Sequence, residues 1–272
     1  MMSVQTVQTG DEQCMLDNME SSPFESSTNY DIVCIGFGTR TLALATALAD
    51  RDPTQRVLIM ERRSHFNSNL ASISPANVSG SVFLRDLITF QNPRSEYTFI
   101  NFLHSKGLLV GFTNVSQMRP SQLLVGEYIA WVAGRTCQLG WTAFNAEATR
   151  IGSTRSSREG RSDRWTVEIR DSASGELSTV TSKRVVVATG SSSSPPDALN
   201  KPEVSPFLIP LRESARLLER MKIAEQPLEI ALLGADQQTV ELMEHLHAIP
   251  GQHRATMIFP GSALRVEDGT PL

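Results

Sequence analysis

Two glycines and an acid are the residues of this 272-residue chain whose types and spacing best fit a chemical task. Gly36 and Gly38 follow an apolar, strand-like stretch and open a helical pattern, and Glu61 closes the next apolar stretch. In a βαβ unit, the first glycine permits a tight turn, the second lets the backbone approach a pyrophosphate, and the acid accepts hydrogen bonds from a ribose. The third glycine position of this fingerprint is Thr41. The pattern predicts a dinucleotide site, and an ordinary strand-to-helix turn is the alternative.

A second apolar stretch ends in a similar turn. Residues 184–190 have the pattern of a buried strand that closes with Ala188, Thr189 and Gly190. Many flavoproteins with two dinucleotide domains carry such a strand end near the diphosphate of the flavin. Thr189 and Gly190 are therefore further candidates for cofactor binding, and a core strand closed by a glycine turn is the alternative.

The composition favours a globular protein that binds small molecules. Hydrophobic residues make up 40% of the chain, enough for a core, and the formal net charge of -4 comes without a dominant block of Lys and Arg, which argues against a nucleic-acid partner. Cys14, Cys34 and Cys137 are odd in number and widely spaced, which indicates neither a disulfide framework nor a zinc site. No stretch reaches the roughly 20 apolar residues of a membrane helix, and no signal-peptide pattern begins the chain. The expected location is therefore the cytoplasm.

The hydrophobic patterns along the chain predict an α/β fold with two nucleotide-binding units. The expected divisions are a disordered leader over 1–28, a first nucleotide-binding domain with inserted helices and a small sheet over 29–195, a linker over 196–210, and a partial second domain over 211–272. Predicted helices span 95–106, 121–135, 211–221 and 237–247. Predicted strands span 141–151, 164–170, 176–181, 184–190, 228–234 and 254–259.

The second unit begins as the first does. Gly234 follows a strand pattern and precedes a helical one, so it is a candidate for contact with a second dinucleotide. About two strands and one helix are expected before the chain stops at Leu272, fewer than in a complete doubly wound domain. We therefore expect this domain to be truncated. In the first domain, a long loop over 67–81 should cross the ligand edge.

Seven stretches occur in the order in which one enzyme family carries similar ones. They are GFGTRTLA (36–43), FLRDL (83–87), NPRS (92–95), YTFINFLH (97–104), GLLVGFTN (107–114), ATG (188–190) and PGSAL (260–264). The chain resembles the flavin-dependent N-hydroxylating monooxygenases, which are the ornithine and lysine N-monooxygenases of siderophore biosynthesis.

The resemblance implies that the first domain binds FAD and the second NADPH. FAD reduced by NADPH would react with dioxygen, and one oxygen atom would pass to the amine of ornithine, lysine or a related metabolite. The substrate partner would then be a small-molecule amine. The protein's part would be to place flavin, nicotinamide and amine and to exclude water.

Several positions depart from the family pattern. Arg85 takes the place of a lysine that meets the substrate's carboxylate, so the resemblance makes it the substrate-binding candidate; a surface arginine is the alternative. The family's flavin-side Trp-His pair and glutamine are absent, because this chain has His65-Phe66 and Gly80-Ser81-Val82 there. In the second fingerprint, Asp236 brings a negative charge where a pyrophosphate should approach, which disfavours NADPH binding.

Three functional readings follow from these features. The leading one is an FAD- and NADPH-dependent N-hydroxylating monooxygenase of siderophore or secondary metabolism. The second is a shortened homologue that binds a flavin or a metabolite without NADPH-dependent oxygenation, and the third is a degraded or interaction-only protein with exposed apolar edges. No catalytic residue is assigned, a homo-oligomer is allowed, and His245, His247 and His253 are expected to be solvated rather than to bind a metal.

Overall fold

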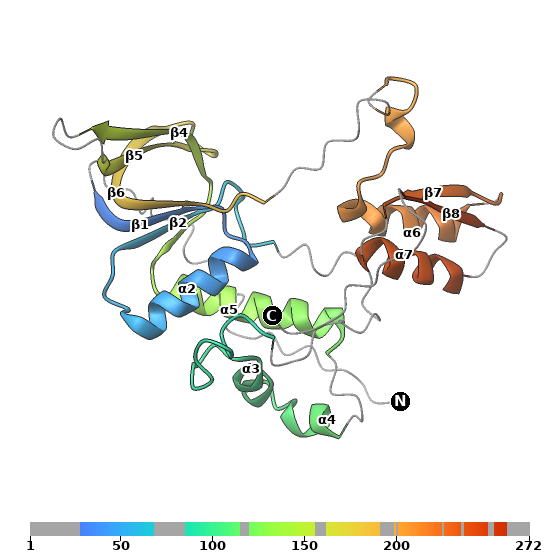
Figure 1. The fold of residues 1–272 in the computed structure, drawn as a ribbon, viewed down its shortest axis with the longest axis horizontal. Helices are drawn as coiled ribbons and strands as arrows, with labels where there is room; N and C mark the ends of the chain where they lie inside the picture. Colours follow the sequence, from blue (N-terminus) through green and yellow to red (C-terminus); the bar gives the residue numbers. More distant parts are fainter. Residues whose placement is uncertain are drawn as a thin grey trace. The chain divides into compact units, whose positions relative to one another are not determined.

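The computed structural model describes residues 28–67, 85–114, 120–155, 162–190, 199, 201–224, 226–234, 237–249 and 253–259. These residues form two compact units, which are coloured along the chain in Figure 1. The first unit holds the described residues up to 114 and those over 127–190, and the second holds 120–126 and those from 199 onward. The expected leader, except Thr28, and the expected loop, except Asn67, lie outside the described residues. The expected domain boundaries stay a prediction.

A six-stranded sheet organises the first unit. Its strands are β1 (Asn29–Ile35), β2 (Val57–Met60), β3 (Thr142–Ala143), β4 (Ala146–Arg155), β5 (Ser162–Asp171) and β6 (Leu177–Val187). Their order in the sheet is β3-β2-β1-β6-β5-β4. The pairs β3·β2, β2·β1 and β1·β6 are parallel, whereas β6·β5 and β5·β4 are antiparallel. Alternation of parallel strands with helices produces the first half, and hairpin turns produce the second.

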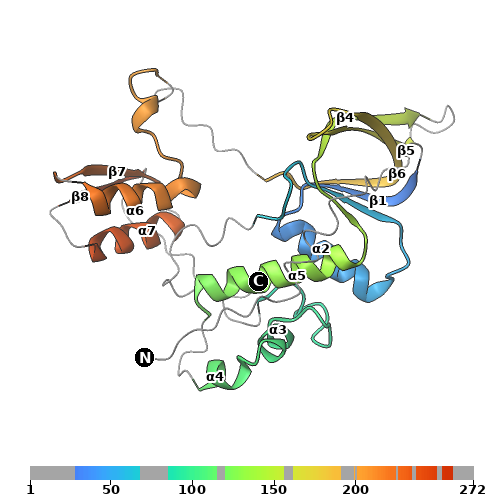
Figure 2. The same ribbon diagram turned by 180° about the vertical axis from the view of Figure 1, so that it is seen from behind.

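The helices of the first unit lie on one side of its parallel strands. They are α2 (Thr39–Arg51), α3 (Phe99–Ser105), α4 (Leu109–Thr113) and the part of α5 (Gln122–Gln138) from Glu127 onward. Figures 1 and 2 both show α2 and α5 on the same side of β1 and β2, while β4, β5 and β6 curl over the other side. The curled strands bury Val33 and Met60 together with Val167, Ile169 and Val180. Because both faces are covered, β2 can be apolar throughout, with all four residues buried.

The strands expected over 176–181 and 184–190 form one strand, β6, which joins the expected small sheet to the parallel strands in a single sheet. The first half of β6 pairs with β5, as Arg170 with Leu177, and its second half pairs with β1, as Ile35 with Val187. The sequence suggested a break near Ser182, a polar residue. In the structure Ser182 is fully buried, and its hydroxyl donates to the Arg184 carbonyl at 2.7 Å, which satisfies the polar atom within the strand.

The single strand expected over 141–151 is instead divided into β3 and β4. Asn145 separates them with a φ of 55°, a left-handed conformation that asparagine tolerates. Its backbone N–H donates to the Arg63 carbonyl at 3.0 Å, and the N–H of Ala146 donates to the Glu61 carbonyl at 2.9 Å. The turn therefore ties this part of the chain to the residues that follow β2.

The helix expected over 95–106 begins later because Thr98 caps it. The Thr98 side chain accepts a hydrogen bond from the Asn101 N–H at 3.3 Å, and the helix ends before Gly107, whose φ is 69°. Four aromatic rings fill the space between α3 and α5: Phe99, Phe102, Tyr128 and Trp131. Their ring centroids are 5.3 to 6.5 Å apart, so they pack edge to face or tilted in a continuous apolar cluster.

The described residues of the second unit from 199 onward form a βαβ arrangement preceded by a helix. Its elements are η3 (Ser205–Phe207), η4 (Leu211–Glu213), α6 (Ser214–Ile223), β7 (Glu229–Leu233), α7 (Gln237–Ala248) and β8 (Arg254–Ile258). Strands β7 and β8 are parallel, and Leu232 packs with Leu218 and Met221 of α6 and Leu242 and Leu246 of α7. The helix expected over 211–221 is therefore split into η4 and α6.

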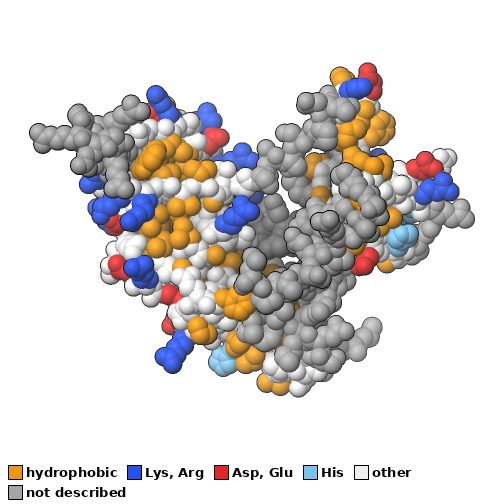
Figure 3. All heavy atoms as spheres, in the orientation of Figure 1, with side chains coloured by type: hydrophobic (Ala, Val, Ile, Leu, Met, Phe, Trp, Pro, Cys, Tyr) orange, Lys and Arg blue, Asp and Glu red, His pale blue; other side chains and the backbone are white. Residues whose placement is uncertain are grey.

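The exposed surface of the first unit mixes both signs of charge. In the face shown by Figure 3, its Lys and Arg side chains are scattered among acidic and apolar ones. The exposed ion pairs include Arg170 with Glu147 at 2.5 Å and Lys183 with Asp31 at 2.7 Å. Within the described ranges, we find no helix with both the length and the apolar character needed to cross a bilayer.

Candidate dinucleotide site

Gly36 makes the turn at the carboxyl end of β1. Its φ is +100°, and a Cβ atom added there would lie 2.5 Å from the Ala188 carbonyl oxygen and 3.2 Å from the Thr189 Cα. Its N–H donates to the Met60 carbonyl at 2.8 Å, and the N–H of Ala188 donates to the Ile35 carbonyl at the same distance. Only glycine combines this φ with so close an approach of two backbones. The turn thus brings together the ends of β1, β2 and β6.

Gly38 is the N-cap of α2. Among the described residues, no atom lies within 4 Å of a Cβ added at Gly38, and no side chain caps this end of the helix. The first turn of α2 carries no acidic residue. The N–H groups at the start of a helix have no partner within the helix, and the helix dipole favours an anion there. This end of α2 has the features of a phosphate site.

Glu61 reaches this turn from the end of β2. Its Oε2 accepts a hydrogen bond from the Phe37 N–H at 3.2 Å, and its Oε1 accepts one from the Arg63 N–H at 3.0 Å. Each oxygen of a carboxylate can accept a further hydrogen bond. Glu61 therefore lies beside the glycine turn with acceptor capacity left for hydroxyl donors such as those of a ribose.

Thr41 closes the turn from the helix side. Its hydroxyl donates to the Gly36 carbonyl at 2.7 Å, and the residue is only 1% exposed. Thr189 and Gly190 come after Ala188, the first residue beyond β6, and are exposed, with Gly190 at a φ of +81°. The candidates Gly36, Thr41, Glu61 and Thr189 are thus gathered at one edge of the sheet, with Gly38 at the start of α2.

An aromatic cluster under the turn was missed from the sequence. Phe37, the residue between the two glycines, is buried, and its ring centroid lies 5.2 Å from that of Phe66 and 6.0 Å from that of Phe144. The only sequence signal was an aromatic residue inside a glycine motif. The packing of the Phe37 ring against these two rings stabilises the backbone of the turn.

Arg85 belongs to a different part of the first unit, where it is an exposed residue of the segment before α3. The neighbouring Asp86 fixes that segment, because its carboxylate accepts hydrogen bonds from the Thr89 and Phe99 N–H groups, both at 2.6 Å. Tyr128 adds a second tie, since its hydroxyl donates to the Tyr97 carbonyl at 2.8 Å and accepts from the Leu87 N–H at 3.3 Å. Burial, with the nearby Asp86 charge, raises the pKa of Tyr128, so its hydroxyl stays protonated.

The second unit repeats the turn of the first, with residue numbers 198 higher throughout. Ile32 pairs with Val57 and Ile230 with Ala255, and just as the Gly36 N–H donates to Met60, the Gly234 N–H donates to the Ile258 carbonyl at 3.0 Å. Gly234 has a φ of +127°.

The residues of the second unit that correspond to Thr41 and Glu61 are Thr239 and Phe259, so the threonine is kept and the acid is not. Thr239 is 5% exposed, and its Oγ1 would lie 3.5 Å from a Cβ added at Gly234. At the position of Glu61 stands Phe259, so the second turn has the threonine without the acid. Asp236 lies outside the described residues, and the effect expected of it stays a prediction.

His253 has a structural partner. His253 Nδ1 accepts a hydrogen bond from the Leu228 N–H at 3.1 Å, next to β7. Within the described part of the chain, no three His, Cys, Asp or Glu residues gather as metal ligands would.

Comparison with known proteins identifies relatives over most of the chain. L-Ornithine N(5)-monooxygenases from Ajellomyces capsulatus and Aspergillus oryzae are 30% and 29% identical to it, each over 89% of this chain and 51% and 50% of their own length. The chain thus spans about half the length of the curated relatives it matches.

Solved structures of similar enzymes share the fold. The ornithine hydroxylase PvdA from Pseudomonas aeruginosa is 26% identical, with a TM-score of 0.71 over 90% of this chain and 58% of that one. The ornithine N-hydroxylase KtzI from Kutzneria sp. 744, described with reduced FAD, NADP+ and L-ornithine, is also 26% identical, with a TM-score of 0.71 over 89% of this chain and 56% of that one.

These likenesses confirm the predicted α/β fold class and the family resemblance. The family model described as L-lysine 6-monooxygenase/L-ornithine 5-monooxygenase matches residues 28–272. The chain belongs to the L-lysine 6-monooxygenase/L-ornithine 5-monooxygenase family.

Proposed function

We propose that this chain takes part in FAD- and NADPH-dependent N-hydroxylation of ornithine, lysine or a related amine in siderophore or secondary metabolism. The observation that carries the proposal is the glycine turn at Gly36, with the Glu61 carboxylate hydrogen-bonded to it and the uncapped start of α2 beside it. Its relatives and solved neighbours are named as ornithine monooxygenases and hydroxylases, one of them with FAD, NADP+ and L-ornithine.

FAD fits the first unit. The start of α2 at Gly38 would hold the diphosphate, and Glu61 would accept hydrogen bonds from the adenosine ribose. Thr41 would hold the turn, while Thr189 and Gly190 would flank the diphosphate from the end of β6. When bound, FAD supplies the redox chemistry with nicotinamide and dioxygen, and these side chains supply binding and orientation.

NADPH is the proposed partner of the turn at Gly234. An acid after the second strand of such a unit hydrogen-bonds the ribose of NADH and repels the 2′-phosphate of NADPH. Phe259 replaces that acid, which favours NADPH over NADH at this site.

Arg85 is the proposed contact for the carboxylate of the amino acid. A guanidinium can hold a carboxylate through two parallel hydrogen bonds, and its charge is permanent. The Asp86 hydrogen bonds keep the start of this segment in place and so reduce the ordering needed when a substrate binds.

The cytoplasm is the proposed location. Cys34 is buried, and burial raises the pKa of its thiol to about 11, which leaves it unreactive at neutral pH. The three cysteines of the chain, Cys14, Cys34 and Cys137, are odd in number and widely spaced, a pattern that suits a reducing compartment.

The visible spectrum of the purified protein, followed by anaerobic addition of NADPH, tests the proposal. We expect a flavin spectrum that bleaches with NADPH, and hydroxylamine formation when oxygen and ornithine or lysine are added. A flavin spectrum that does not bleach would instead favour a flavin-binding homologue without NADPH-dependent oxygenation. A colourless protein that does not bind added FAD would overturn the proposal.

A further inference from the structure

One peptide bond in the glycine turn is hydrogen-bonded at both of its ends. The Gly36 carbonyl accepts from the Thr41 hydroxyl at 2.7 Å, and the N–H of the same peptide, on Phe37, donates to Glu61 Oε2 at 3.2 Å. The carbonyl and the N–H of a trans peptide point in opposite directions. Thr41 and Glu61 therefore fix the orientation of the same peptide plane, one by a hydrogen bond to its C=O group and the other by a hydrogen bond to its N–H group.

The orientation of this peptide plane must be fixed by hydrogen bonds, because the plane adjoins Gly36, whose backbone torsion angles have the widest range in the turn. Gly36 lacks a Cβ and has a φ of +100°, so its neighbouring peptide has few steric limits of its own. The Thr41 residue is only 1% exposed, so its hydroxyl is shielded from water. A hydrogen bond in such a setting fixes orientation more firmly than an exposed one.

We propose that Thr41 is a positioning residue for the dinucleotide site. Its hydroxyl sets the plane of the Gly36–Phe37 peptide, and that plane sets where the Glu61 carboxylate stands for the ribose. This inference rests on the proposed function, since it assumes that the first turn binds FAD. Thr41 touches neither the ribose nor the diphosphate in this account, and it acts through Glu61.

In the second unit the threonine of the turn is kept although the acid is not. Thr239 occupies the same place beside Gly234 and is almost as buried, although Phe259 has replaced the acid. The threonine thus accompanies the left-handed glycine in both turns. Its coupling to a ribose-binding acid exists in the first turn alone.

Substitution of Thr41 with measurement of FAD affinity tests the role. We expect Thr41→Val, which keeps the shape and removes the hydroxyl, to weaken FAD binding about tenfold, the effect of one well-placed hydrogen bond. Thr41→Ser should stay within about threefold of the unchanged protein. The matched control is Thr46→Val, because Thr46 lies in the same helix, is equally buried, and donates to the Ala43 carbonyl at 3.0 Å away from the turn. It should leave FAD affinity unchanged.

A double-mutant cycle with Glu61→Gln distinguishes positioning from a general loss of stability. If Thr41 acts through Glu61, the effects of Thr41→Val and Glu61→Gln on FAD affinity will be clearly less than additive, whereas those of Thr46→Val and Glu61→Gln will add. If Thr41→Val does not fold, Thr41→Ala and Thr41→Ser make the same comparison, since both lack the methyl group and differ in the hydroxyl.

The outcomes separate the two proposals. Unchanged FAD affinity in Thr41→Val, or additivity with Glu61→Gln, would overturn the positioning role while leaving the FAD site intact. Failure of the unsubstituted protein to bind FAD would overturn the proposed function, and the positioning role with it.

Discussion

The backbone of Gly36 lies against that of Ala188, with 2.5 Å between the Ala188 carbonyl oxygen and the place a Cβ on Gly36 would occupy. The contact joins the turn after β1 to the end of β6. It leaves no room for a side chain between the two segments that are proposed to hold the flavin's diphosphate.

Gly36→Ala should therefore both destabilise the first unit and abolish FAD retention. The left-handed φ alone costs a residue with a Cβ roughly 1–2 kcal/mol, and the clash with Ala188 adds to it. Thermal melts and the flavin-to-protein absorbance ratio would measure the two effects. Gly111→Ala is the control, because no described atom outside its own helix backbone lies within 4 Å of its added Cβ and its φ is not positive. A Gly36→Ala protein as stable and as yellow as the control would contradict the site.

Arg85→Ala should raise the KM for ornithine roughly tenfold to a hundredfold, the value of a charge-assisted hydrogen bond to a carboxylate. Arg85→Lys should recover part of the loss, since it keeps the charge without the paired geometry. Steady-state hydroxylation assays would provide these values. A diamine without a carboxylate, such as 1,4-diaminobutane, is the internal control, and its KM should not change with Arg85→Ala. Equal effects on both substrates would argue against the carboxylate contact.

Tyr128→Phe should lower the free energy of unfolding by about 1–3 kcal/mol, because it leaves the Tyr97 carbonyl and the Leu87 N–H without their partner. Urea denaturation followed by circular dichroism would measure the change. Because the ring and its aromatic neighbours remain, packing is preserved and the loss reports on the hydroxyl. A midpoint equal to that of the unsubstituted protein would show that the ties to the Arg85 segment contribute nothing to stability.

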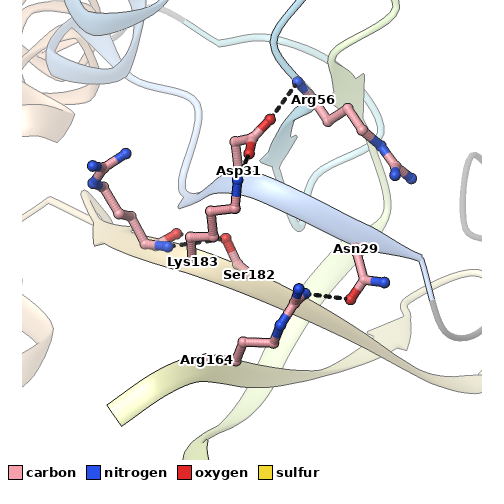
Figure 4. Close-up of polar contacts among 7 residues, drawn as sticks. Asn29, Asp31, Arg56, Arg164, Ser182 and Lys183 are labelled. Carbon is pink, nitrogen blue, oxygen red and sulfur yellow. Dashed lines mark hydrogen bonds and ion pairs between the residues drawn. The ribbon is translucent and has the colours of Figure 1, made fainter. Parts of the chain in front are cut away.

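Asp31 should make stability depend on pH at the acidic end. Its carboxylate accepts from Lys183 Nζ at 2.7 Å and from the Arg56 N–H at 3.2 Å, which links β1 to β6 and to the residue before β2 (Figure 4). These contacts, first the Lys183 hydrogen bond, hold the pKa of Asp31 below its ordinary value of 3.8. A lowered folded-state pKa stabilises the fold above about pH 4, and the gain is lost as the pH falls through the folded-state value.

Melting temperatures of Asp31→Asn and of the unsubstituted protein should therefore differ near neutral pH and converge as the pH falls through the lowered folded-state pKa of Asp31. The difference will be small, since the pair is exposed, and added salt should reduce it. A difference that grew toward low pH would have the wrong sign for this explanation.

Phe259→Glu should shift nucleotide preference away from NADPH. The new carboxylate would stand where Glu61 stands in the first unit and would repel a 2′-phosphate, weakening NADP+ binding about tenfold relative to NAD+. Titration of each nucleotide into the FAD-loaded protein would measure the ratio, with Phe259→Leu as the uncharged control. An equal loss for both nucleotides would place Phe259 outside the ribose site.

The sequence alone was enough to predict the fold class, the first βαβ unit and the family. Glycine spacing and apolar runs are local signals, so the turn at Gly36 could be located before its geometry was known. The hydrogen bond from Phe37 to Glu61 and the contact with Ala188 could not be predicted, because they depend on which strands lie beside each other. β6 shows the same limit. The polar Ser182 indicates a break between two strands when the sequence is read alone. In the structure its hydroxyl donates to the Arg184 carbonyl, and the strand continues.

The central position of β6 also affects how the first unit can be made. Asn29 of β1 pairs with Thr181, 152 positions later in the chain. At a synthesis rate of roughly 5–20 residues per second, β1 is synthesised about 8–30 s before β6, the strand that pairs with its second edge. Until then one edge of β1 can pair with another chain. The sheet can close only late and through distant contacts, which makes slow folding and a need for chaperones during synthesis expected properties of this unit.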